Sequence, residues 1–138
     1  MKIGTLFLKL AALYFLIGVG MGLTMEIIGD HRLMGAHAHI NLVGWASMGL
    51  FGVIYVLFPK AGETLLAKLH FWLYNISLPL FMLGLSFLLL GNESLMLLLQ
   101  IFPNVLVLAV LFFVINIFQN VKAADVAHHF HRDKGLSL

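Results

Sequence analysis

Apolar residues fill four long runs of the chain, and polar or turn-forming residues gather in the short breaks between them. Each run is close to the ~20 apolar residues that a helix needs to cross a bilayer. The predicted spans cover about residues 5–28, 37–58, 69–90 and 95–118. The breaks hold turn residues such as Gly29-Asp30, Pro59 to Gly62 and Gly91-Asn92, and short connections favour antiparallel neighbours. The pattern therefore predicts an all-α, integral membrane four-helix bundle, in which Pro79 and Pro103 kink the third and fourth helices.

Composition strengthens this prediction. Of 138 residues, 62% are hydrophobic and 10% are charged, whereas soluble domains are about 45–50% apolar and about 25% charged. The length allows one membrane domain, residues 1–138. The net charge of +2 is too small to suggest a nucleic-acid partner. Cysteine is absent, which excludes disulfides, thiolate metal sites and covalently attached c-type haem.

Basic residues predict the orientation of the chain, because lysine and arginine collect on the cytoplasmic side of a membrane. With four spans, one side carries Lys2, Lys9, Lys60, Lys68, Lys122, Arg132 and Lys134. The other side has Arg32 alone. We therefore expect both termini in the cytoplasm of a cell with a bacterial-type inner membrane. The polar tail, residues 119–138, then lies inside, and its His128, His129 and His131 are expected to be solvated.

Two histidines at membrane depth are the main candidates for chemistry, because ionisable residues there are costly and often functional. His37 and His39 open the second run on the outer side, and Asn41 follows one turn after His37. Residues i and i+2 of a helix point about 200° apart, so the pair is poorly placed to chelate one ion. Each imidazole can instead address a different neighbour. The alternative is a pair of interfacial residues that hydrogen-bond to headgroups or to the backbone.

Haem b, bound without a covalent link, is the cofactor that this pattern favours. Haem is large, flat and apolar, its iron accepts neutral imidazole, and its propionates need cationic or hydrogen-bonding partners. Arg32 and His31 precede the pair on the outer side and can serve the propionates, although both also suit a solvated loop. The small residues that continue the run leave room for a flat ligand or for close helix packing; they are Gly44, Ala46, Ser47, Gly49 and Gly52.

Copper is the alternative cofactor. Met21 and Met25 stand at i and i+4 near the outer end of the first run, with Met34, His31 and His37 close in sequence. Thioethers and imidazole suit Cu(I), which would make the chain a copper-handling or assembly partner of a respiratory oxidase. Ordinary packing also explains a methionine pair.

A further histidine opens the third run, on the inner side. His70 lies beside Trp72 and Tyr74, residue types that favour the membrane interface. We therefore expect His70 to be an interfacial anchor.

A resemblance to a known family enters on the second run. The segment Ala36 to Asn41, with Gly44-Trp45 and Gly52 to Pro59, resembles the haem-ligand helices of heme–copper oxidase subunit I, closest to the nitric oxide reductase and cbb3-type branches. In that family an H-x-H pair near the outer side ligates two haems, one from each histidine. The resemblance implies that His37 and His39 bind haem iron, for electron transfer or for binding a small gas such as O2 or NO.

The same resemblance implies an assembly. Family members have twelve spans in three pseudo-symmetric groups of four, and this chain has the size of one group. It lacks the tyrosine-linked histidine motif of the copper centre, so the isolated chain is not expected to turn over a substrate. A homotrimer would rebuild the core, with each second helix offering His37 to one neighbour and His39 to the other.

Overall fold

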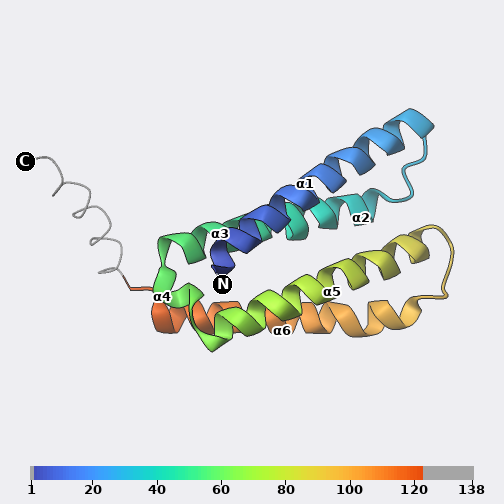
Figure 1. Cartoon of the computed structure of the whole chain (residues 1–138). Helices are drawn as coiled ribbons and strands as arrows, with labels where there is room; N and C mark the ends of the chain where they lie inside the picture. The colour runs from blue at the N-terminus through green and yellow to red at the C-terminus, as the bar shows by residue number, and fades with distance from the viewer. Residues whose placement is uncertain (1, 123–138) are drawn as a thin grey trace, which may run out of the picture.

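The computed structural model of the protein describes residues 2–122, and within this range every regular element is a helix (Figure 1). Three of the long helices are α1 (Ile3–Ile28), α5 (Leu65–Leu89) and α6 (Met96–Asn120). The second span is built from α2 (Met34–His39), a π-helix η1 (Ile40–Ser47) and α3 (Met48–Leu57). A short helix, α4 (Pro59–Gly62), joins it to α5. The prediction of an all-α chain with four apolar helices is confirmed, with ends that differ by a few residues.

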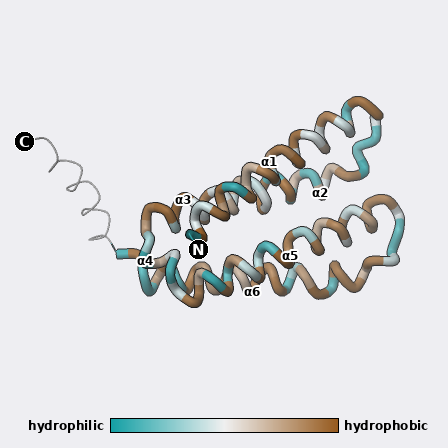
Figure 2. Tube along the Cα trace, viewed as in Figure 1, coloured by the Kyte–Doolittle hydropathy of each residue, from teal (hydrophilic) through white to brown (hydrophobic). Residues whose placement is uncertain are grey.

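All four long helical segments have the length and apolar composition to cross a membrane. Figure 2 shows hydrophobic residues along most of each helix and polar residues at the turns that join the helices. Since most large apolar side chains on the outer faces are exposed, the bundle suits lipid rather than water as its surroundings. The chain is therefore a multi-pass membrane protein.

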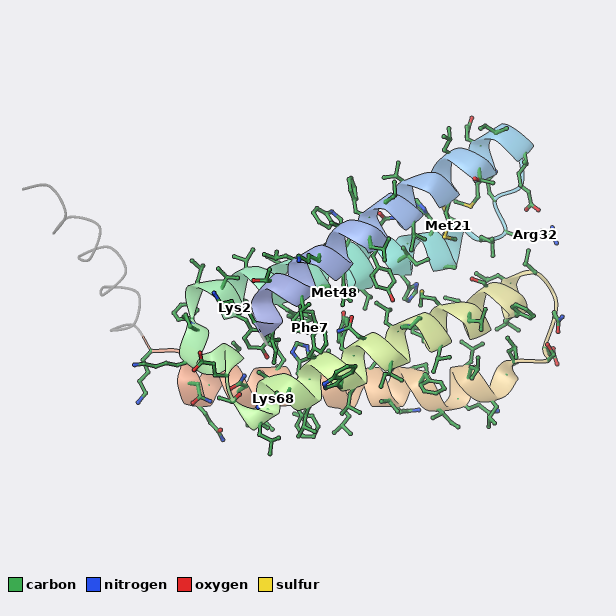
Figure 3. The ribbon with its side chains drawn as sticks, viewed as in Figure 1. Lys2, Phe7, Met21, Arg32, Met48 and Lys68 are labelled. Atoms are coloured by element: carbon green, nitrogen blue, oxygen red, sulfur yellow. The ribbon has the colours of Figure 1, made fainter. Side chains whose placement is uncertain are left out.

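The four helices form two hairpins. One pairs α1 with the second span, and the other pairs α5 with α6 (Figure 1). The hairpins meet at the end that carries α4 and the N-terminus, and they diverge toward the opposite end. Lys2 and Lys68 lie at the first end and Arg32 lies at the other (Figure 3). These three basic residues therefore lie at opposite ends of the bundle.

Local sequence explains where the helices end. Gly29 adopts a left-handed conformation with φ 66° and ends α1, a role that glycine fills without a Cβ clash. Thr64 precedes α5, and its hydroxyl accepts a hydrogen bond from the Ala67 amide at 3.0 Å. Pro79 and Pro103 lie within α5 and α6, and neither proline ends its helix.

Candidate functional site

His37 projects from α2 toward α1. Its Nδ1 lies 2.9 Å from the carbonyl oxygen of Gly18, and its ring is half-buried. Gly22 faces the same ring, and a Cβ built on Gly22 would come within 3.0 Å of the His37 Cε1 atom. The two glycines of α1 therefore give the imidazole both a hydrogen-bond acceptor and the space that it occupies.

His39 points to a different neighbour. Its Nδ1 lies 2.8 Å from the carbonyl oxygen of Gly35, four residues earlier in the same helix, and the side chain is exposed. Its ring meets the ring of Phe81 on α5 edge to face, with centroids 5.6 Å apart. The two imidazoles thus contact different helices, as their i and i+2 spacing requires.

The hydrogen bonds of His37 and His39 determine which nitrogen of each ring has a lone pair for a metal ion. A backbone carbonyl only accepts, so the Nδ1 of His37 and the Nδ1 of His39 each carry the hydrogen and donate it. Each neutral ring then has its lone pair on Nε2. Histidines that ligate metal through Nε2 commonly have their Nδ1–H held by such a carbonyl. The donor chemistry of both residues therefore fits axial ligation of a haem iron.

The Asn41 side chain contacts both the backbone and the ring of His37. Its Nδ2 donates to the carbonyl oxygen of His37 at 2.9 Å and lies 3.4 Å from the His37 Nδ1. A Cβ on Gly18 would come within 2.5 Å of the Asn41 Oδ1. The absence of a side chain at Gly18 is therefore required for this pairing of α1 with the second span. Asn41 acts as a positioning residue for His37.

The π-helix that follows His39 was not expected from the sequence. It covers Ile40–Ser47, and the Tyr74 hydroxyl of α5 donates to the carbonyl oxygen of Val43 at 2.9 Å. π-helical segments are rare and often occur at functional sites, because the wider turn frees carbonyl groups and redirects side chains. Here the wide turn places one backbone acceptor against the second hairpin.

Arg32 and His31, predicted as propionate partners, each contact an acidic residue nearby in the chain: Asp30 in the loop after α1, and Glu26 within α1. Arg32 Nη2 donates to Asp30 Oδ2 at 2.6 Å and Arg32 Nε donates to the same carboxylate at 3.0 Å. The side-chain hydrogen bond from Arg32 lowers the pKa of Asp30 to about 2. His31 Nε2 lies 3.6 Å from the Glu26 carboxylate. A guanidinium has five N–H donors, so Arg32 retains donors beyond those that hold Asp30.

The methionine pair borders a hollow of about 390 Å³ near the C-terminal end of α1. Met21 and Met25 line it together with Asp30 and with Leu90 at the end of α5. Met25 is 4% exposed, whereas Met34 is 51% exposed. Within residues 2–122, His, Asp and Glu side chains form no cluster of three or more that could hold a metal ion. A copper site would therefore depend on the thioethers.

His70 lies elsewhere than the sequence led us to expect. We expected an interfacial anchor, but His70 is fully buried, and so is its neighbour Tyr74 at 1% exposure. Trp72, in contrast, is 56% exposed. The His70 Nδ1 lies 3.0 Å from the Tyr55 hydroxyl of α3. The residue therefore belongs to the contact between the hairpins.

A buried polar network extends from His70 toward α4. Asn116 of α6 donates through Nδ2 to the Ala61 carbonyl oxygen at 2.9 Å and to the Tyr55 hydroxyl oxygen at 3.4 Å. The Thr64 hydroxyl lies 3.0 Å from the Asn116 Oδ1. Since Tyr55 accepts from Asn116, its own hydrogen is free to donate to the His70 Nδ1. We refer to Tyr55, Asn116, Thr64 and His70 as the inner polar cluster.

Aromatic rings from all four spans surround the His70 imidazole. The ring centroids lie between 4.6 and 5.8 Å from that of His70 for Phe7, Phe51, Tyr55, Tyr74 and Phe113. Phe7 and Met48 lie between the two hairpins near this point (Figure 3). Among residues 2–122, His70 Nε2 has no hydrogen-bond partner, so its hydrogen faces ring π-systems, which are weak acceptors. The sequence offered no signal for this site, because its members come from distant spans.

The tail histidines, His128, His129 and His131, lie outside the described residues.

No known protein family, curated protein or solved structure matches the chain. The function must therefore be argued from the residues of this chain alone.

Proposed function

We propose that the protein binds haem b non-covalently through His37 and His39, for electron transfer or for binding a small gas. One observation carries this proposal: both rings donate Nδ1–H to a backbone carbonyl oxygen, Gly18 for His37 and Gly35 for His39. This leaves each Nε2 lone pair free on a ring whose orientation is already fixed. Haem needs only one or two protein ligands per iron, so it does not require the larger ligand clusters of other metal sites.

The two histidines would serve different irons, because they contact different helices. His37 lies against α1 and His39 faces α5. The second axial ligand of each iron would then come from another copy of the chain. We propose a closed homotrimer, in which each second span offers His37 to one neighbour and His39 to the other. The resemblance of residues 36–59 to heme–copper oxidase subunit I motivates the number three.

Bound haem would supply a redox-active iron, and the chain would supply its position and surroundings. The carbonyl groups of Gly18 and Gly35 would orient the two imidazoles. The side chain of Asn41 would hold the helical turn that starts at His37, through its hydrogen bond to the His37 carbonyl oxygen. Two axial histidines fill the iron coordination and favour electron transfer, whereas one leaves a position for O2 or NO. Arg32 and His31 would meet the propionates at the outer surface.

The orientation of the protein follows the same proposal. Lys2, Lys60 and Lys68 belong to the end where the hairpins meet, and such residues collect on the cytoplasmic side. We propose that both termini face the cytoplasm across a cell inner membrane. The haem-binding end would then face outward.

A reduced-minus-oxidised visible spectrum of the purified protein tests the proposal. We expect sharp low-spin haem bands, which His37→Ala and His39→Ala each reduce and which the double variant abolishes. The matched control replaces three histidines outside the described residues, His128, His129 and His131, with alanine and should keep the full spectrum. A colourless protein, or full haem content in the double variant, would refute haem binding through this pair.

The hollow beside Met21 and Met25 favours copper as the second candidate function, because both thioethers line it and thioethers suit Cu(I). Such a protein would handle copper for a respiratory oxidase or assist its assembly. Elemental analysis distinguishes the two candidates. Copper in a colourless protein, lost in Met21→Leu with Met25→Leu and kept in His39→Ala, would support copper handling.

A further inference from the structure

One face of α6 is exposed along the whole span. The buried residues of α6 lie on the side that packs against the rest of the bundle: Leu106, Ala109 and Asn116. The opposite side carries an exposed stripe, which we call the α6 stripe: Gln100, Asn104, Val107, Leu111, Val114 and Phe118. Val107 is 68% exposed and Phe118 is 86% exposed. At 100° per residue, the stripe points almost directly away from the buried side.

The spacing of the α6 stripe is that of a coiled-coil seam. Its members are separated alternately by four and three residues, the heptad pattern that lets two parallel helices pack side by side with a small crossing angle. Any straight face of an α-helix has this spacing, so the polar side chains of the stripe must distinguish a helix partner from lipid.

Two carboxamides make this stripe unfavourable toward lipid. α6 has 25 residues and is ~37 Å long, and Asn104, its ninth residue, lies ~12 Å from the outer end. Asn104 Nδ2 donates to the backbone carbonyl of Gln100 at 2.7 Å. Within residues 2–122 no hydrogen bond reaches the Asn104 Oδ1 or the Gln100 side chain. Unpaired carboxamide groups in hydrocarbon carry a large desolvation cost.

We infer that the α6 stripe binds the α6 stripe of a second copy of this chain. Copies inserted in one membrane with one topology bring their α6 helices together in parallel, so Asn104 meets Asn104 and Gln100 meets Gln100 at equal depth. A carboxamide both donates and accepts, which makes each pair self-complementary. Asparagine at one seam position also fixes register and orientation in parallel helix pairs.

The contact uses a face other than the one that carries the haem ligands. His37 lies against α1 and His39 against Phe81 of α5, whereas the α6 stripe points away from α5. The inference therefore does not depend on haem, because the α6 contact joins two copies through a surface that the proposed haem ligands do not use. The two proposals can fail separately.

Cysteine crosslinking in native membranes tests the inference, because the chain has no cysteine of its own. Single variants Val107→Cys and Leu111→Cys should form oxidised dimers, since facing positions bring Cα atoms within about 6 Å. Ile101→Cys and Leu108→Cys are matched controls, because both are exposed on α6 but lie about 100° from the stripe centre. Asn104→Leu, placed in the Val107→Cys chain, should weaken association about tenfold.

The crosslinking yields at the stripe and control positions either support or overturn the α6 contact. Dimers at the stripe positions and not at the controls support the α6 contact, and their persistence with His37→Ala and His39→Ala separates it from haem binding. Absence of crosslinks at both stripe positions, or equal crosslinking at Ile101 and Leu108, would overturn it.

Discussion

Adding one methyl group at Gly18 should destabilise the protein, whereas adding one at Gly20 should not. A Cβ on Gly18 would lie 2.5 Å from the Asn41 Oδ1 and 2.6 Å from its Nδ2. A Cβ on Gly20, two residues later in α1, would meet no atom of the described part of the chain within 4 Å. The pair therefore compares the same chemical change in the same helix, with and without a neighbour.

The expected magnitude follows from these distances. To restore an ordinary contact of about 3.4 Å, the Asn41 carboxamide must move by about 0.9 Å. Its 2.9 Å bond to the His37 carbonyl oxygen would then stretch beyond hydrogen-bond length. Overpacking costs about 1–3 kcal/mol, and a lost hydrogen bond in a membrane costs about 0.6 kcal/mol. Alanine offsets about 0.5–1 kcal/mol of this as the better helix former.

We therefore expect Gly18→Ala to lower the free energy of unfolding by about 1–3 kcal/mol and Gly20→Ala to raise it by up to about 1 kcal/mol. Unfolding by SDS in mixed micelles, followed by circular dichroism, measures both. Under the haem-binding proposal, Gly18→Ala should also release haem more readily, because the Gly18 carbonyl oxygen accepts the hydrogen bond from the His37 ring. If the two variants unfold at the same SDS fraction, the proposed interlock of Gly18 and Asn41 is wrong.

Two further predictions concern the inner polar cluster and the outer loop. Tyr55→Phe should cost about 1–3 kcal/mol, because it leaves the buried His70 Nδ1 without its donor. Adding His70→Phe should recover most of this loss, since the ring site stays filled while both imidazole nitrogens are removed; an additive double variant in thermal unfolding would contradict the pairing. Arg32→Ala should return the pKa of Asp30 from about 2 toward its ordinary value of 3.8, measured by carboxyl NMR titration. Because the folded pKa is depressed, the Arg32 contact stabilises the loop above pH ~4, and the effect fades as the pH falls toward 2; an unchanged pKa in Arg32→Ala would refute the contact.

The spans were predictable from the sequence because lipid imposes a local rule. A helix must satisfy its own backbone and show apolar side chains over about 20 residues, and each run met both conditions without reference to the others. The two-sided direction of His37 and His39 was also predictable, since it depends only on the helical angle between neighbours two apart. Local periodicity is sufficient for features of this kind.

The burial of His70 was missed because it depends on partners far away in the chain. His70 resembles an interfacial anchor beside Trp72, and its burial follows only once Phe7 of α1 and Phe113 of α6 pack on its ring. The loop contact of Arg32 with Asp30 spans two residues and was not anticipated, because charge count alone assigned Arg32 to topology or to propionates. The π-helix likewise gave no compositional signal.

The order in which the chain is synthesised has a consequence for the inner polar cluster. The ribosome releases Tyr55 with the first hairpin and Asn116 only near the end of α6, 61 residues later. Until then the Tyr55 hydroxyl lies in a half-built bundle without the donor that finally binds it. The hydrogen bond from Asn116 to the Tyr55 hydroxyl oxygen can therefore form only after α6 has been synthesised. A chain that stops before residue 116 lacks the donor that binds this hydroxyl, although it already contains the whole first hairpin.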